Sequence, residues 1–368
     1  MSKLDVDRIM RDEIKKLKPY IPGKPIAEVK AEYGLDRVIK LASNENPLGV
    51  SKSVQDVIKK ESANVYRYPD GGCRLIKKEL SKKLNISEDM LLFGNGSDGL
   101  LKVIAETFLK NEQEVIISNP TFVEYIFIAN MMGAHLIRIF MDNYKQNLNA
   151  MLEATTRKTR MIFLTGPHNP AGTIYTKEEF EDFMNDIPDN VIVIVDEAYY
   201  EYIKSEDYPD VIEYIKNDYP IILLRTFSKA YALAGLRLGY AIASPEIIKP
   251  MSMVRDPFNV NRLAQEAARA AINDNEFLQK TIEINEKGKE YLYSELDKRD
   301  IGYVSTEANF ILINMKMDSM RIFNKLLRKG IIIRPGKPLG YPEHIRVTVG
   351  LPEENKIFIN SIDKLMTE

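Results

Sequence analysis

The sequence predicts an α/β fold in which an open, mostly parallel sheet is covered by helices on both faces. Between about residues 90 and 245, short β-branched segments alternate with longer segments of helical periodicity, as in a doubly wound sheet. One of these segments, Val191–Val195, is apolar at every position, which is typical of a strand buried on both faces. After about residue 250 the pattern changes to longer helices and fewer strands, which indicates a second, smaller α+β domain.

The first part of the chain is predicted to contain six strands and three helices. The strands are Met90–Phe93, Val115–Ser118, Met161–Leu164, Val191–Val195, Ile221–Arg225 and Leu238–Ala243. The helices are Ser97–Leu109, Thr121–Met132 and Lys177–Ile187. We expect a Ser/Asp cap at the start of the first helix and a stop at Gly133 after the second.

The second part is predicted to form the smaller domain together with the amino-terminal segment, because residues 1–41 precede the first strand of the larger sheet. The predicted boundaries are 45–265 for the large domain, and 1–44 with 266–368 for the small domain and its N-terminal arm. The elements expected in this part are helices Val260–Ile272, Phe277–Leu296 (a connector), Ser319–Lys329 and Glu353–Met366, and strands Phe310–Met315, Ile331–Arg334 and Ile345–Val349.

Composition excludes several classes of function. The 51 basic and 53 acidic side chains give a net charge of −2, so neither nucleic acid nor an anionic membrane is expected as a partner. A single cysteine and three histidines leave no room for a zinc cluster, and no metal is expected. The charged amino terminus does not resemble a signal peptide, and no apolar segment is long enough to span a membrane. We therefore expect a cytoplasmic protein.

A glycine-rich loop, Gly94–Gly99, lies between a predicted strand and a predicted helix and matches G-x-G-x-x-G. A nicotinamide site would need an acidic residue after the next strand, but that strand runs into Asn119-Pro120. Two interpretations remain open. The loop is either an anion cradle at a helix start or an ordinary strand-to-helix turn capped by Ser97.

Two further candidates follow the predicted strands of the sheet centre. Two prolines and two glycines make Gly166–Thr173 a rigid turn that offers Asn169 as a hydrogen-bond donor, and His168 is interpreted as a loop residue rather than a catalyst. Asp196 ends the fully apolar strand, where a carboxylate costs several kcal/mol without a cationic partner. An arginine salt bridge is the alternative interpretation for Asp196.

The segment Thr226–Arg237 places Lys229 among hydroxyls and small residues. A desolvated lysine loses its proton easily and becomes a nucleophile, although a lysine whose stem packs while its ammonium reaches water is the alternative. The hydroxyls of Thr226 and Ser228 and the guanidinium of Arg237 are good anion ligands.

Together these groups predict one ligand, pyridoxal 5′-phosphate. Ser97, Thr226, Ser228 and Arg237 would hold its phosphate. Asp196 would face its ring nitrogen and Lys229 would take its aldehyde, which is the combination that this cofactor requires. Lys229 would then be the base for the proton shift on the substrate.

Several segments carry a resemblance to a known family. They are Leu17–Tyr20, Pro22–Pro25, Leu41–Pro47, Tyr66–Gly71, the glycine loop, the Asn169 turn, Asp196–Tyr199, Ser228-Lys229 and Arg346. On these segments the chain resembles the fold-type-I aminotransferases, and within them the histidinol-phosphate branch. The resemblance implies a large domain built on a mostly parallel seven-stranded sheet, a smaller α+β domain and a homodimer.

The resemblance also implies a role for each site residue. Lys229 would bind the cofactor covalently, Asp196 would pair with the ring nitrogen, and Asn169 and Tyr199 would bond the ring's 3-oxygen. Phe122 would stack on the ring. The remaining cofactor contacts would come from backbone amides near Ser97 and Asp98, from Thr226, Ser228 and Arg237, and from Tyr68 of the neighbouring subunit.

For the substrate, the resemblance assigns anion binding to Arg346, with Arg334 and Tyr20 as helpers. A surface ion pair and a helix-packing tyrosine are the alternatives for these two helpers. His168 and Ala171 replace residues common in the family, a departure that leaves Asn169 intact but bears on substrate contacts.

The activity implied is amino transfer between L-histidinol phosphate and 2-oxoglutarate, which gives imidazole acetol phosphate and L-glutamate in histidine biosynthesis. An aromatic amino acid aminotransferase and a lyase similar to threonine-phosphate decarboxylase are the alternatives.

Overall fold

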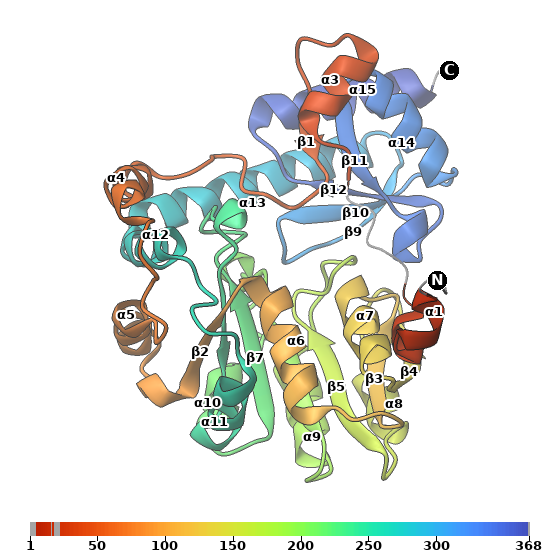
Figure 1. Ribbon diagram of the computed structural model, residues 1–368. Helices are drawn as coiled ribbons and strands as arrows, with labels where there is room; N and C mark the ends of the chain where they lie inside the picture. Colours follow the sequence, from red (N-terminus) through yellow and green to blue (C-terminus); the bar gives the residue numbers. More distant parts are fainter. Residues whose placement is uncertain (1–4, 16, 18–22, 367–368) are drawn as a thin grey trace.

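The computed structural model describes residues 5–15, 17 and 23–366, which fold around two sheets (Figure 1). The larger sheet has seven strands in the order β2-β8-β7-β6-β5-β3-β4, and β8 alone runs in the direction opposite to the other six. This confirms the predicted mostly parallel α/β class. The strands are β2 (Leu91–Gly94), β3 (Glu114–Asn119), β4 (His135–Phe140), β5 (Thr159–Thr165), β6 (Ile192–Asp196), β7 (Ile221–Thr226) and β8 (Gly239–Ile242).

Both faces of this sheet are buried, because successive side chains of a strand point to opposite faces. In β6, Val193 and Val195 belong to one apolar core and Ile194 to another. Helices α6 (Gly96–Phe108), α7 (Val123–Met131) and α11 (Pro245–Val254) contribute to the core around Ile194. The opposite core receives α4 (Lys52–Glu61), α5 (Arg74–Leu84), α8 (Leu148–Glu153), α9 (Lys177–Asn185), α10 (Val211–Lys216) and α12 (Arg262–Asn273).

The smaller sheet has the strand order β1-β11-β12-β10-β9, so a strand from the amino-terminal segment joins strands from the end of the chain. These strands are β1 (Ile39–Leu41), β9 (Gly302–Val304), β10 (Phe310–Asn314), β11 (Ile331–Pro335) and β12 (His344–Thr348). Its core includes side chains from α13 (Asn275–Asp297), α14 (Ser319–Arg328) and α15 (Pro352–Met366). Helices α1 (Val6–Ile9), α2 (Asp12–Lys15) and α3 (Ile26–Tyr33) precede β1.

Helix α13 connects the two halves of the molecule, as predicted for this segment. Its residue Leu278 packs against the core of the larger sheet, whereas Leu292 and Leu296 lie in the core of the smaller one. Figure 1 shows α13 running from beside α4 and α12 to the smaller sheet.

The predicted strands and helices are all present, with ends displaced by a few residues. Strand β4 was not predicted because it lies at the sheet edge and its side chains are exposed or half-buried, so it lacks an apolar run. The stop at Gly133 is confirmed, and this glycine has a φ of +74°. The predicted Ser/Asp cap of α6 is wrong: Asn95 occupies the cap position without a side-chain bond, and Asp98 pairs with Arg237 instead.

A buried ion pair ties β6 to β7 beneath the carboxyl ends of the strands. Arg225 Nη2 lies 2.7 Å from Glu197 Oε2, and both side chains are almost fully buried. Tyr208 donates a hydrogen bond of 3.0 Å to Glu197 Oε1, and the Arg225 guanidinium lies 3.5 Å from the centroid of the Tyr200 ring. The carboxylate and the guanidinium therefore both have partners within the fold.

Glu197→Ala should lower the free energy of unfolding by about 3–5 kcal/mol, because it leaves the Arg225 charge buried without its partner. Urea denaturation measures this quantity. Glu213→Ala is the control, since it removes a surface pair with Lys216 and should cost about 1 kcal/mol or less. Equal losses in the two variants would contradict the assigned role of the buried pair.

Candidate active site

The predicted site residues meet at one edge of the larger sheet. Asn169 follows β5, Asp196 ends β6 and Lys229 follows β7, and these three strands are parallel neighbours. The carboxyl ends of parallel strands share an edge, which is where open α/β sheets bind ligands. Gly172, in the same turn as Asn169, accepts a hydrogen bond from Thr306, so the segment before β10 closes over this edge.

One end of the site is a cluster of anion-binding groups. Ser228 Oγ lies 3.0 Å from Thr226 Oγ1 and 3.4 Å from Arg237 Nη1. Arg237 Nη2 lies 3.1 Å from Asp98 Oδ2, in the first turn of α6. The structure thus brings together Asp98, Thr226, Ser228 and Arg237 as predicted.

Two glycines allow this close approach. A Cβ on Gly239 would lie 2.7 Å from the backbone nitrogen of Ser97, and a Cβ on Gly96 would lie 2.6 Å from Arg237 Nη2. Gly96 also has a φ of +75°, which disfavours other residues. No described side chain caps the first amides of α6. Helix amides of this kind, beside hydroxyls and a guanidinium, suit a phosphate.

Asp196 is the buried carboxylate at the centre of the site. Its Oδ2 accepts a 2.8 Å hydrogen bond from the Tyr125 hydroxyl, and its Oδ1 accepts one of 3.0 Å from the Ala198 amide. Among the described residues no basic side chain forms an ion pair with it, so the alternative of an arginine salt bridge is wrong here. Burial raises the pKa of Asp196 to about 6, against the opposing effect of these hydrogen bonds. A cationic ligand would restore the charge balance.

The predicted nucleophile lies beside the predicted ring-oxygen ligands. Lys229 Nζ lies 5.6 Å from the centroid of the Tyr199 ring and donates a 3.1 Å hydrogen bond to the Ser43 carbonyl. Asn169 Nδ2 lies 3.4 Å from the Tyr199 hydroxyl. Lys229, Tyr199 and Asn169 therefore converge, as the resemblance implies.

The two predicted substrate arginines lie directly opposite each other in the smaller sheet. Arg334 of β11 and Arg346 of β12 are partners in an antiparallel pair, so their side chains leave the same face. Arg346 Nη1 donates to Asn169 Oδ1 and Nη2 donates to the Ala42 carbonyl. Like charges in this arrangement repel each other, and an anion between them would relieve the repulsion.

Other predicted residues have different surroundings. Phe122 is half-buried before α7 and packs edge-to-face on Tyr125. Tyr68 is 79% exposed and stacks on Phe258 with the ring centroids 4.7 Å apart. The prediction for Tyr20 lies outside the described residues.

His168 is a structural part of the Asn169 turn. Its Nδ1 accepts a hydrogen bond from the Ala171 amide, so its Nε2 carries the proton and donates to Ser118 Oγ at 3.1 Å. Burial lowers the pKa of His168 to about 3. The ring is therefore neutral and serves the turn, in agreement with its interpretation as a loop residue.

Sequence reasoning missed two site residues. Tyr125 supports Asp196, and its one signal was a tyrosine within the mostly apolar helix α7. Asn44 lies on the other side, where its Nδ2 is 2.9 Å from the Tyr199 hydroxyl. Asn44 belongs to the Leu41–Pro47 segment that carried the resemblance, but no chemical pattern in the sequence linked it to Tyr199.

These residues fit pyridoxal 5′-phosphate. The anion-binding cluster, the buried carboxylate and the lysine match its phosphate, its ring nitrogen and its aldehyde. Among the described residues, no cluster of His, Cys, Asp and Glu could hold a metal ion, and no helix is long and apolar enough to cross a membrane.

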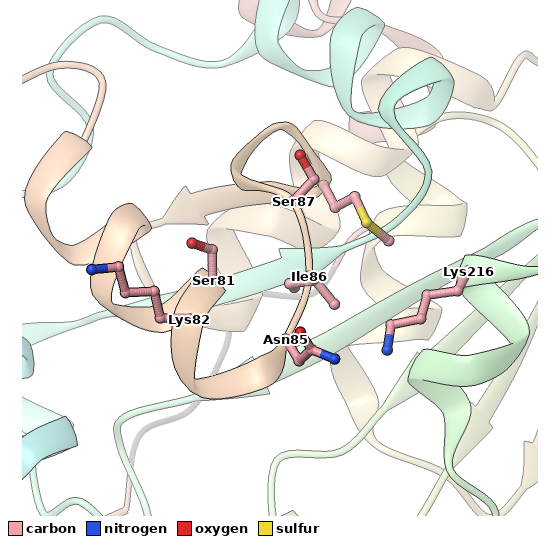
Figure 2. A pocket seen from close by; sticks show the side chains of 7 residues that line it. Ser81, Lys82, Asn85, Ile86, Ser87 and Lys216 are labelled. Carbon is pink, nitrogen blue, oxygen red and sulfur yellow. The ribbon is translucent and has the colours of Figure 1, made fainter.

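A surface hollow elsewhere does not belong to this site. It lies beyond α5 and is lined by none of the predicted residues (Figure 2). Its lining consists of Ser81, Lys82, Asn85, Ile86, Ser87, Met90 and Lys216.

Without the cofactor, the charge of Asp196 should weaken the fold as the pH rises. A carboxyl whose pKa rises from 3.8 to about 6 on folding binds its proton more tightly in the folded state. Stability is therefore lost between about pH 4 and pH 6, by a total of about 3 kcal/mol. Asp196→Asn should remove this loss, so its stability relative to the wild type should increase between pH 4 and pH 7.

Urea unfolding of cofactor-free protein across this pH range measures the effect. Asp189→Asn is the control, because Asp189 is exposed at the surface and is not among the groups that interact with Asp196, so this variant should not show the increase. A constant difference between Asp196→Asn and the wild type at every pH would contradict the assignment.

Comparison with known proteins agrees with this chemistry. Residues 36–362 match the model of the aminotransferase class I and II family. The histidinol-phosphate aminotransferase of Moorella thermoacetica is 44% identical over 97% of this chain and 92% of its own length. That of Caldicellulosiruptor saccharolyticus is 43% identical over 97% of this chain and 100% of its own.

Solved structures show the same fold at lower identity. A histidinol-phosphate aminotransferase from Sinorhizobium meliloti, solved with pyridoxal-5′-phosphate, superimposes with a TM-score of 0.89 at 24% identity, covering 97% of this chain and 98% of that one. L-threonine-O-3-phosphate decarboxylase from Porphyromonas gingivalis gives 0.80 at 20% identity, covering 90% and 100%. The fold alone thus serves both transfer and decarboxylation. Given the site, the family match and the full-length relatives, this chain belongs to the class I and II aminotransferases, in the group of the histidinol-phosphate aminotransferases.

Proposed function

We propose that this protein transfers an amino group between L-histidinol phosphate and 2-oxoglutarate, with pyridoxal 5′-phosphate as its cofactor. The products would be imidazole acetol phosphate and L-glutamate, a step of histidine biosynthesis. The observation that carries the substrate assignment is the opposed pair Arg334 and Arg346 beside Asn169. Two guanidiniums on one face suit an anion with several oxygens, and both a phosphate and a carboxylate qualify.

Different residues of the chain would bind the cofactor phosphate, the ring nitrogen and the substrate proton. Thr226, Ser228 and Arg237 anchor the cofactor phosphate. Asp196 keeps the ring nitrogen protonated, so that the bound cofactor supplies an electron sink for the substrate carbon. Lys229 would hold the cofactor, and its amine would be the base that moves the proton at the substrate carbon.

Asn169 and Tyr199 are proposed to contact the cofactor ring at its 3-oxygen. Their polar groups lie between Lys229 and Arg346, which suits contact with the ring's 3-oxygen. Phe122 is proposed to cover the ring face, and Tyr20 to assist with the substrate anion.

Kinetics with matched substrates test the assignment. With 2-oxoglutarate as acceptor, kcat/KM should be at least about tenfold higher for histidinol phosphate than for histidinol or phenylalanine, equivalent to about 1.4 kcal/mol in transition-state binding. Arg334→Ala should reduce this preference by raising KM for the phosphate substrate. Lys229→Ala should abolish turnover.

Two results would overturn the proposal in favour of the alternatives. A preference for phenylalanine would identify an aromatic aminotransferase. Release of carbon dioxide from threonine phosphate without consumption of 2-oxoglutarate would identify the lyase.

We also propose that the protein is a homodimer in which Tyr68 reaches the cofactor phosphate of the partner. Tyr68 stacks on Phe258 at an exposed apolar surface, and a surface of this kind is typical of an interface. Other large apolar side chains close to these two in the sequence are also exposed, namely Val65, Tyr66, Met253 and Val254.

The domain division is likewise a proposal. Residues 45–265 would form the cofactor-binding domain, and 1–44 with 266–368 the small domain. The composition of the two sheets supports it. The single cysteine, which cannot form a disulfide within the chain, supports a cytoplasmic location.

Mixing two inactive variants tests the shared site. Lys229→Ala and Tyr68→Ala should each lose most activity alone. If dimers re-form at random after mild denaturation and refolding, half are hybrids with one complete site, so activity should return to about a quarter of the wild type. Activity no greater than the sum of the separate variants would show that Tyr68 acts within its own subunit or not at all.

A further inference from the structure

Two amide side chains, those of Asn44 and Asn169, direct their nitrogen atoms towards the Tyr199 hydroxyl. The Nδ2 of Asn44 lies 2.9 Å from the hydroxyl oxygen, and the Nδ2 of Asn169 lies 3.4 Å from it. Tyr199 is 3% exposed and Asn44 is 1% exposed, so water does not compete for these bonds. An amide nitrogen donates and does not accept. The Tyr199 oxygen is therefore the acceptor in both contacts.

The orientation of the Asn44 amide is fixed by Thr348. The Thr348 hydroxyl accepts a 2.9 Å hydrogen bond from the backbone amide of Asn44 and lies 3.1 Å from Asn44 Oδ1. Its single proton is then available to Oδ1, which keeps the oxygen side of the amide on Thr348 and the nitrogen side on Tyr199. Asn309 also holds the Asn44 backbone by donating to its carbonyl at 3.1 Å.

The orientation of the Asn169 amide is fixed in the same way by Arg346. A guanidinium can only donate, so the atom of Asn169 that faces Arg346 Nη1 is its oxygen. Arg346 and Thr348 are two residues apart on β12, and residues at that spacing leave the same face of a strand. One strand of the small sheet thus sets both amides.

We propose that Asn44, held by Thr348, is a positioning residue that reserves the Tyr199 hydroxyl proton for the 3-oxygen of the bound cofactor. Both amides donate to the hydroxyl oxygen and neither can accept its proton. The proton is therefore available to the ligand. Donors on the phenolic oxygen also strengthen the hydrogen bond that this group donates. The inference rests on the proposed contact of Tyr199 with the cofactor.

The consequence is a property of the bound cofactor that can be measured. The cofactor's 3-oxygen and the nitrogen that Lys229 contributes share one proton when the site is loaded. A strong donor on the oxygen stabilises its negative charge and so favours the form that has lost this proton. The charged groups near Tyr199 are Lys229, which lies over its ring and interacts with Asp196, and Arg346, which donates to Asn169. Lys229 and Arg346 also donate to the Ser43 and Ala42 carbonyls beside Asn44, so an effect of Asn44 through Tyr199 has to be separated from one through these two cations.

The experiment is a pH titration of the visible absorption of the holoenzyme loaded with pyridoxal 5′-phosphate. Asn44→Ala should raise the midpoint by about half a pH unit or more, as the loss of one hydrogen bond implies. Tyr199→Phe should raise it further. In the Tyr199→Phe background, Asn44→Ala should add no further shift, because the group through which it acts is absent.

A second variant tests the orientation without removing Asn44. Thr348→Val lets the amide turn its oxygen to the Tyr199 proton, and it should raise the midpoint in the same direction. Asn285→Ala is the matched control, because it removes an equally buried amide that donates to the Ala308 carbonyl and should leave the midpoint unchanged.

Two outcomes would overturn the inference. One is an unchanged midpoint in both Asn44→Ala and Thr348→Val, and the other is an Asn44→Ala shift of equal size with and without the Tyr199 hydroxyl. Either result in a holoenzyme that still transfers amino groups would refute the role of Asn44 alone. A wild-type protein without a titrating visible band or transfer activity would refute the proposed function instead.

Discussion

The buried charge of Asp196 is the constraint on which the site depends. A carboxylate at the end of a strand buried on both faces costs free energy unless a positive charge meets it. The fold supplies two hydrogen bonds, from Tyr125 and from the Ala198 amide, but no ion pair among the described residues. Burial accordingly raises the pKa of Asp196 to about 6. The protein is therefore arranged to receive a cation from a ligand.

The neighbouring carboxylate, Glu197, differs from Asp196 in having a basic partner within the fold. Glu197 is next to Asp196 in the chain, yet it is paired with Arg225 and bonded by Tyr208. The two carboxylates differ in which basic residue of β7, or of the segment after it, lies near them. Arg225 faces Glu197 inside the fold, whereas Lys229, which follows the strand end, remains at the ligand side. Glu197 is thus paired within the fold, whereas Asp196 has no ion-pair partner among the described residues.

The features that the sequence predicted are those with local causes. Val191–Val195 predicted a strand of a parallel sheet because a short segment that is apolar at every position suits burial on both faces, and the residues after the strands predicted the site because such ends converge. Strand β4 was missed because an edge strand needs no apolar face. The expected cap of α6 was wrong because Asp98 is engaged by Arg237, a contact set by tertiary structure. The roles proposed for Asn44 and Thr348 depend on contacts between the segment after β1, strand β12 and Tyr199, which follows β6. These segments are far apart in the sequence, so no local pattern encodes their contacts.

Asp196 is proposed to hold a protonated ring nitrogen, and nitrogen NMR of holoenzyme loaded with ring-¹⁵N pyridoxal 5′-phosphate observes that proton state directly. At pH 8 the wild type should show the chemical shift of a protonated pyridine nitrogen, and Asp196→Ala should show that of a neutral nitrogen. A neutral ring nitrogen in the wild-type holoenzyme would contradict this role of Asp196.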